Sequence, residues 1–276
     1  MRLPQALLLG LLSCTLAAPA AAQASDPAPE LPWKQGGVYL GGFLTRYDST
    51  VRLGADAAGL ALEVNLEDAF GLDSSSQDLR FGAFWRFGES QRHEVTIDYL
   101  RSSRSASKTL QEDITIGDTT YPAGTGVSVD STLSIIRASY SYSFVLDDRI
   151  DLAASFGLYT MPFSFEFAGV SNTENEDFTA PLPVFGLHAD YAITPDLFLR
   201  QRIDLFYLEY GDFRGGLADI YLGLEWFPWE HVGIGLGFEN FRLGIEAEND
   251  SYPGMSLNGN VKYQQTGLFG YLTYAF

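Results

Sequence analysis

Charged side chains recur at every second position in several segments of this 276-residue chain. Arg200, Arg202 and Asp204 alternate with apolar residues, and so do His188 and Asp190. An imidazole two residues from a carboxylate on one strand face could be oriented for general acid–base catalysis. Opposite charges on one face could also form ion pairs, which buried charges require. The pattern therefore allows either a catalytic pair or a structural lattice of ion pairs.

We expect the lattice, with no catalytic residue and no metal site. Its predicted members occupy the face opposite the apolar residues and carry both signs of charge. They are Arg86, Glu94, Arg137, Asp151, His188, Asp190, Arg200, Arg202, Asp204 and Glu225. The same side chains would line a narrow channel for polar solutes, so the sequence does not separate a filled lumen from an open one.

These residues lie in segments that alternate with a period of two, which predicts β-strands. We count ten, beginning near residues 37, 79, 92, 131, 150, 181, 197, 217, 232 and 261. Short connections (88–91, 146–149, 194–196 and 228–230) alternate with longer ones, 211–217 among them. This rhythm is typical of a transmembrane antiparallel up-and-down β-barrel with both termini on the short-turn, periplasmic side. Eight or twelve strands stay open as alternatives.

In two segments the apolar residues change face midway. Residues 150–158 present one apolar set and 161–167 the opposite one, and the same happens between Phe238 and Phe241. An inserted residue that exchanges the faces of a strand is a β-bulge, so we expect bulges at both places.

A membrane rather than a soluble barrel is favoured by strand length and by aromatic residues at the ends of the apolar faces. The expected interfacial girdle consists of Trp85, Phe87, Phe144, Tyr191, Trp226, Phe227 and Trp229. Such rings prefer the headgroup level of a bilayer, and the strands approach the 9–11 residues needed to cross it.

The first residues predict a secreted protein. Residues 1–24 read as a signal peptide, 25–35 as a Pro-rich linker and 36–276 as the barrel. Cleavage there would remove Cys14, the only cysteine, and with it any disulfide chemistry. The formal net charge of −18 repels phosphate polymers, so nucleic acid is not an expected partner. Acidic loops such as 169–180 could hold Ca²⁺ or share cations with lipopolysaccharide, although they lack EF-hand spacing.

The chain ends in alternating residues, Leu272, Tyr274 and Phe276. This pattern resembles the C-terminal signature that the barrel-insertion machinery of Gram-negative bacteria recognises. Segments such as "AFGLDSSSQDLRFGAFWRF" and "APLPVFGLHADYAITPDL" are similar to a group of proteobacterial outer-membrane proteins without assigned function. The resemblance implies the fold and the cell outer membrane as location, but no catalytic residues.

We therefore expect a monomeric outer-membrane barrel without cofactors, in contact with outer-membrane lipid and lipopolysaccharide. Its expected role is structural, or passage of small solutes. Two alternatives are a surface-exposed binding or adhesion protein that acts through long acidic loops, and an outer-membrane hydrolase. Hydrolytic barrels of the protease type use an Asp/His pair at the extracellular rim, and those that cleave lipid use His with Ser. His93 and His231 lie at short turns without such motifs.

Overall fold

The computed structural model describes residues 31–53, 64–65, 67–68, 71–111, 113–116, 119–168, 173–211, 213–247 and 259–276. The expected signal peptide and residues 25–30 lie outside these ranges. Within them, no helix is long and apolar enough to cross a bilayer.

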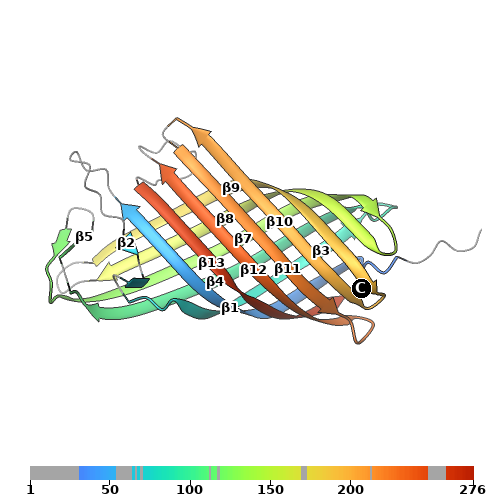
Figure 1. Cartoon of the computed structure of the whole chain (residues 1–276), viewed down its shortest axis with the longest axis horizontal. Coiled ribbons are helices and arrows are strands. Elements are labelled where there is room, and N and C mark those ends of the chain that lie inside the picture. Colours follow the sequence, from blue (N-terminus) through green and yellow to red (C-terminus); the bar gives the residue numbers. More distant parts are fainter. Residues whose placement is uncertain are drawn as a thin grey trace, which may run out of the picture. The chain divides into compact units, whose positions relative to one another are not determined.

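Ten long antiparallel strands form one sheet that closes on itself (Figure 1). The strands are β1 (Gly36–Leu53), β3 (Ser75–Phe87), β4 (His93–Thr109), β7 (Gly126–Leu146), β8 (Ile150–Ala168), β9 (Thr173–Thr194), β10 (Leu197–Tyr210), β11 (Phe213–Trp226), β12 (Val232–Ala247) and β13 (Gly259–Ala275). Closure comes from β1 and β13, which pair from Gly37 opposite Ala275 to Leu53 opposite Gly259. The predicted ten-stranded barrel is confirmed.

The two ends of the barrel differ in their connections. At one end, called the short-turn end, tight turns join β3 to β4, β7 to β8, β9 to β10 and β11 to β12. Gly36 and Phe276 exchange two backbone hydrogen bonds there, at 3.0 and 2.9 Å. The other end, the long-loop end, carries β2 (Val64–Asn65) and the hairpin of β5 (Ile114–Ile116) and β6 (Thr119–Tyr121). The expected long connection over 211–217 is wrong, because β11 already begins at Phe213.

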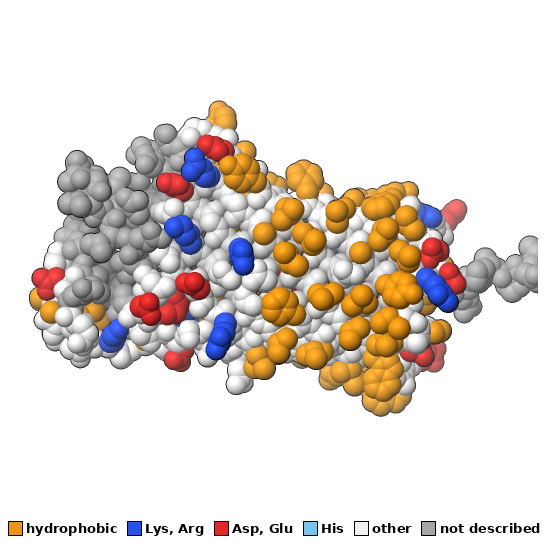
Figure 2. Space-filling view, viewed as in Figure 1, with side chains coloured by type: hydrophobic (Ala, Val, Ile, Leu, Met, Phe, Trp, Pro, Cys, Tyr) orange, Lys and Arg blue, Asp and Glu red, His pale blue; other side chains and the backbone are white. Residues whose placement is uncertain are grey.

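The outer face of the short-turn half is an apolar belt (Figure 2). Leu79, Ile97 and Phe185 point outward with 59, 59 and 69% of their surface exposed, although they are among the most apolar side chains of the chain. A continuous exposed surface of this kind requires hydrocarbon around it, and a closed barrel leaves no unpaired backbone group in that hydrocarbon.

Most of the predicted aromatic girdle lies on this belt, with one exception. The exposed members are Trp85, Phe87, Phe144, Tyr191, Trp226 and Trp229. Phe227 is only 4% exposed, so its assignment to the girdle is wrong. It follows the last residue of β11, and the chain turns inward there, so that its ring packs against Phe198 inside the barrel mouth.

In the long-loop half the polarity of the wall is reversed. Arg46 and Arg242 are exposed on the outside, whereas Leu182, Phe241 and Ile245 are buried within. This reversal explains both face changes in the sequence, and the predicted bulges are wrong. The pairing of β12 with β11 and β13 is unbroken, and so is that of β8 with β9. The backbone keeps its phase, and the apolar side chains move to the other face where hydrocarbon ends outside.

Candidate functional site: the enclosed lumen

Buried ion pairs fill the middle of the barrel. The Arg137 side chain donates from Nε to Asp98 at 2.7 Å, and its Nη1 lies 3.3 Å from Asp204. Arg202 binds Asp219 at 2.7 Å and Asp204 at 3.2 Å. These groups come from β4, β7, β10 and β11, so the pairs connect strands across the lumen as well as within the sheet.

Arg80 extends this central lattice to the opposite wall. Its guanidinium lies 3.4 Å from Asp98 on the neighbouring strand β4 and also pairs with Glu239 on β12. All three side chains are 7% exposed or less. A buried charge without a partner is costly, and here each guanidinium lies between two carboxylates.

A second group of ion pairs lies nearer the short-turn end. Arg86 lies between Glu94 at 3.0 Å and Asp151 at 2.6 Å. Arg200 lies between Asp190 at 2.5 Å and Glu225 at 2.6 Å. The hydroxyl of Thr273 also donates to Glu225 at 2.7 Å.

The structure places all ten lattice candidates of the sequence on the inner wall. It does not bring His188 and Asp190 together, because Asp190 binds Arg200 instead. His188 Nε2 lies 4.0 Å from Asp204 Oδ1, beyond hydrogen-bond distance.

Five further residues take part in the lattice. Arg80, Asp98, Asp219 and Glu239 lie on the charged strand face that the sequence identifies, although they are not among the ten predicted members. Tyr159 is the fifth, and its buried hydroxyl donates to Asp204 at 3.0 Å and to Asp219 at 2.7 Å. Its inward direction is hard to predict from the sequence, because the face change of β8 resembles a bulge at this point.

Apolar layers close the lumen on both sides of the ion pairs. At the short-turn end, Trp33 packs on Phe198 with ring centroids 5.6 Å apart, and Phe227 and Ala275 complete the cluster. Trp33 belongs to the segment expected to be linker, yet it is only 5% exposed. Toward the long-loop end, a larger apolar core includes Leu133, Tyr159, Met161, Leu182, Phe241, Leu243 and Ile245.

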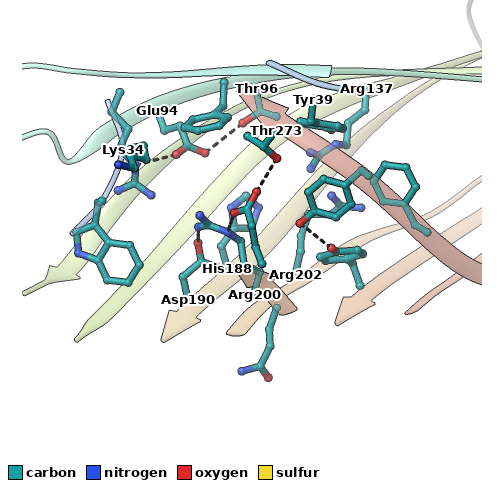
Figure 3. A pocket seen from close by; sticks show the side chains of 18 of the residues that line it. Lys34, Tyr39, Glu94, Thr96, Arg137, His188, Asp190, Arg200, Arg202 and Thr273 are labelled. Carbon is teal, nitrogen blue, oxygen red and sulfur yellow. Dashed lines mark hydrogen bonds and ion pairs between the residues drawn. The ribbon is translucent and has the colours of Figure 1, made fainter. Parts of the chain in front are cut away.

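A cavity of about 150 Å³ lies between the Trp33 cluster and the central lattice (Figure 3). We call it the chamber. Arg200, Arg202, His188 and Asp190 contribute to one side of it, and Tyr39 to another. The arrangement can bind and orient a small polar molecule, since charged and aromatic groups converge on one partly enclosed space.

Ion pairs at the rim of the long-loop end are exposed to solvent and are therefore weaker than those in the lumen. Arg214 lies 3.1 Å from Glu209 and 3.8 Å from Glu246. Hydrogen bonds from Tyr207 and Arg214 lower the pKa of Glu209, and the Glu209 carboxylate raises the pKa of Arg214. Among the described residues, no three His, Cys, Asp or Glu side chains lie close enough to hold a metal ion. The expected loop over 169–180 is wrong for most of its length, because β9 already begins at Thr173, and the side chains of 169–180 lie outside the description.

No protein family model and no curated protein sequence matches this chain. Among solved structures, the outer-membrane protease OmpT from Escherichia coli matches over 87% of this chain and 96% of its own, with a TM-score of 0.57 and 10% identity. The chain folds as an outer-membrane β-barrel. The translocator domain of the autotransporter NalP from Neisseria meningitidis covers 87% of this chain and 88% of its own, at 12% identity and a TM-score of 0.46. At such identities the likeness concerns the fold and not the activity.

Proposed function

We propose that this barrel is a closed, non-conducting component of the outer membrane with a structural role in the envelope. The filling of the lumen carries the proposal. From the short-turn end inward come the Trp33 cluster, the chamber, the buried ion pairs and the apolar core around Phe241 and Ile245. A hydrated solute would have to displace both apolar layers, which favours a closed wall over a channel.

The proposed orientation puts the short-turn end in the periplasm and the long-loop end outside the cell. Short periplasmic turns and longer extracellular loops are the usual arrangement of such barrels. The belt would then contact outer-membrane lipid, and the polar outer wall above it would lie at the level of lipopolysaccharide. We propose a monomer, because the sheet is closed and offers no free edge for pairing.

Conductance in planar bilayers tests the closed lumen. We expect no stepwise current from the wild type or from a variant with both Arg137→Ala and Arg200→Ala, because the apolar core above the lattice stays in place. A general porin reconstituted in the same way serves as positive control. Regular steps in the wild-type trace would contradict the proposal and support the narrow solute channel.

Insertion through the C-terminal residues is part of the proposal. Leu272, Tyr274 and Phe276 point outward at the short-turn end, with 52–59% of their surface exposed. Phe276→Asp is expected to leave the protein in the periplasm. Phe144→Asp is the matched control, because Phe144 is equally exposed (53%) at the same end of the belt. Surface insertion of the Phe276 variant at the level of this control would refute the signal.

A second candidate function is binding at the cell surface. It is favoured by strands that continue beyond the belt with polar outer side chains, among them Ser103 and Ser105 on β4. Loss of adhesion to host matrix when the barrel is removed from the surface would support it.

A hydrolase is less well supported. His188 lies in the lumen, and His93 and His231 lie at short turns, so the chain has no imidazole at the long-loop rim. Turnover of peptide or lipid that His188→Ala abolishes would support a hydrolase instead.

A further inference from the structure

We infer that the chamber is a binding site for a small organic anion with an apolar body, entered from the short-turn end and capped by Trp33. Its two walls differ in chemistry. Tyr39, Tyr221, Phe269 and Tyr271, from β1, β11 and β13, form an aromatic wall. The guanidinium groups of the lattice lie on the rest of the surface.

Glycines behind the aromatic wall keep the chamber open. A Cβ atom at Gly235 would lie 2.0 Å from the Tyr271 ring, and one at Gly223 would lie 2.2 Å from the Tyr221 hydroxyl. Both rings therefore rest directly against the backbone of the wall. Any side chain at these glycines would push a ring into the cavity. Glycine at both positions therefore lets the rings lie against the backbone and keeps the cavity free.

More cations than carboxylates line the other wall, although its arginines also pair with deeper carboxylates such as Asp98, Asp151 and Asp219. Its lining cations are Lys34, Arg80, Arg86, Arg137, Arg200 and Arg202, against the carboxylates Glu94, Asp190 and Glu225. Arg80 Nε, Arg86 Nη1 and His188 Nε2, all from lining residues, are buried without a hydrogen-bond partner among the described residues. The carboxylate oxygens that also lack one belong to Asp151, Asp204 and Asp219, which do not line the chamber. An acceptor-rich group in the chamber would compensate the shortage at the lining nitrogens.

Arg200 is the residue that we expect to contact the anion. Its side chain is 21% exposed, the highest value of the five lattice arginines, although it lies inside the barrel. Asp190 binds its Nη1 and Glu225 its Nε, so Nη2 is directed to neither carboxylate. A carboxylate ligand could accept from this nitrogen without breaking either pair.

The volume and the cap determine the size and route of the ligand. A cavity of about 150 Å³ admits a molecule of the size of benzene. Trp33 covers it from a segment that is not part of a strand. The segment is held by hydrogen bonds from Trp33 Nε1 to Asp147 O (2.6 Å), from Lys34 Nζ to Glu230 O (2.8 Å) and from Arg86 N to Gln35 O (2.6 Å). Displacement of the Trp33 ring would break its hydrogen bond to Asp147 and its packing on Phe198 but no pairing between strands, whereas the long-loop side is closed by the apolar core.

Benzoate is the probe for this site. Calorimetry on the purified, folded barrel in detergent is expected to show saturable benzoate binding and weaker binding of the neutral isostere benzamide. The combined variant Arg200→Gln, Asp190→Asn and Glu225→Gln removes the guanidinium without leaving an unpaired charge. It should weaken benzoate binding about tenfold or more, as expected for a hydrogen bond to a charged group.

Trp33→Ala tests the cap separately. We expect faster association and dissociation of benzoate, with the preference over benzamide retained. Equal binding of benzoate and benzamide, unchanged benzoate binding in the Arg200 combination, or absence of binding in both the wild type and Trp33→Ala would overturn the inference. These outcomes are independent of the conductance test, because a barrel that is closed to ions could still hold a ligand at one end.

Discussion

The two halves of the barrel are built from the same strands with opposite polarity. On β12, Leu236 and Phe238 point outward in the short-turn half, and Arg242 points outward in the long-loop half. On the inner face of the same strand, Glu239 gives way to Phe241. One face of a continuous strand can therefore be apolar in one half of the barrel and polar in the other. Hydrocarbon outside requires apolar side chains there, and water outside allows the apolar residues to collect within.

The interiors of the two halves also hold the wall together differently. The interior of the long-loop half is mostly apolar and stabilises the wall through burial without directional requirements, although one buried ion pair, Arg104 with Glu67 at 2.6 Å, also lies there. The lattice, which lies in the middle of the barrel and toward the short-turn end, fixes particular partners, since Arg80 on β3 reaches Glu239 on β12 and Arg137 on β7 reaches Asp204 on β10. Buried ion pairs add little net stability compared with apolar packing, but removing one partner is expensive.

Of the changes considered, breaking the lattice is expected to lower stability most. Arg137→Leu leaves Asp98 and Asp204 short of a partner and should lower the free energy of unfolding by about 3–5 kcal/mol. Arg214→Leu is the control, because the Arg214 side chain is 59% exposed and its pairs are worth about 0–1 kcal/mol. Urea unfolding in lipid vesicles measures both. Equal stability of the two variants would show that the buried charges do not depend on one another.

Placing a charge on the outer wall should have a somewhat smaller effect that depends on the half. Ile97→Arg, in the belt on β4, is expected to cost about 2–4 kcal/mol because the guanidinium would meet hydrocarbon. Ser105→Arg, outward on the same strand in the long-loop half, should change the unfolding free energy by less than about 0.5 kcal/mol. A comparable loss for both variants would place the bilayer boundary elsewhere.

The smallest expected effect concerns a short turn. Backbone N–H groups of Arg149 and Ile150 donate to the Asp147 carboxylate at 2.8 and 2.7 Å and lower its pKa. Because the folded pKa lies below the unfolded value, the contribution is present above the unfolded pKa of about 4 and disappears as the pH falls through the folded pKa. Asp147→Asn should therefore lose less stability than the wild type between neutral and strongly acidic pH, as measured by unfolding at stepped pH. Parallel acid profiles of the two proteins would contradict this.

Period-two alternation made the strand number and most of the inner wall predictable, because side chains on a strand can only alternate. The inward direction of the ten lattice candidates therefore followed from the sequence. Which cation meets which carboxylate was not predictable, since the pairs cross the lumen between strands such as β3 and β12 that are far apart in sequence. His188 illustrates the limit: the sequence put it beside Asp190, and the fold placed its Nε2 4.0 Å from Asp204 Oδ1.

The sequence by itself thus determined the closed sheet, its apolar belt and the charge of its lumen, because these follow from local alternation and from turn lengths. The tertiary structure decided three further features: the reversal of polarity along continuous strands, the inward packing of Trp33 and Phe227, and the chamber bounded by glycine-backed tyrosines. Each depends on distances across the closed cylinder, and only closure brings those residues together.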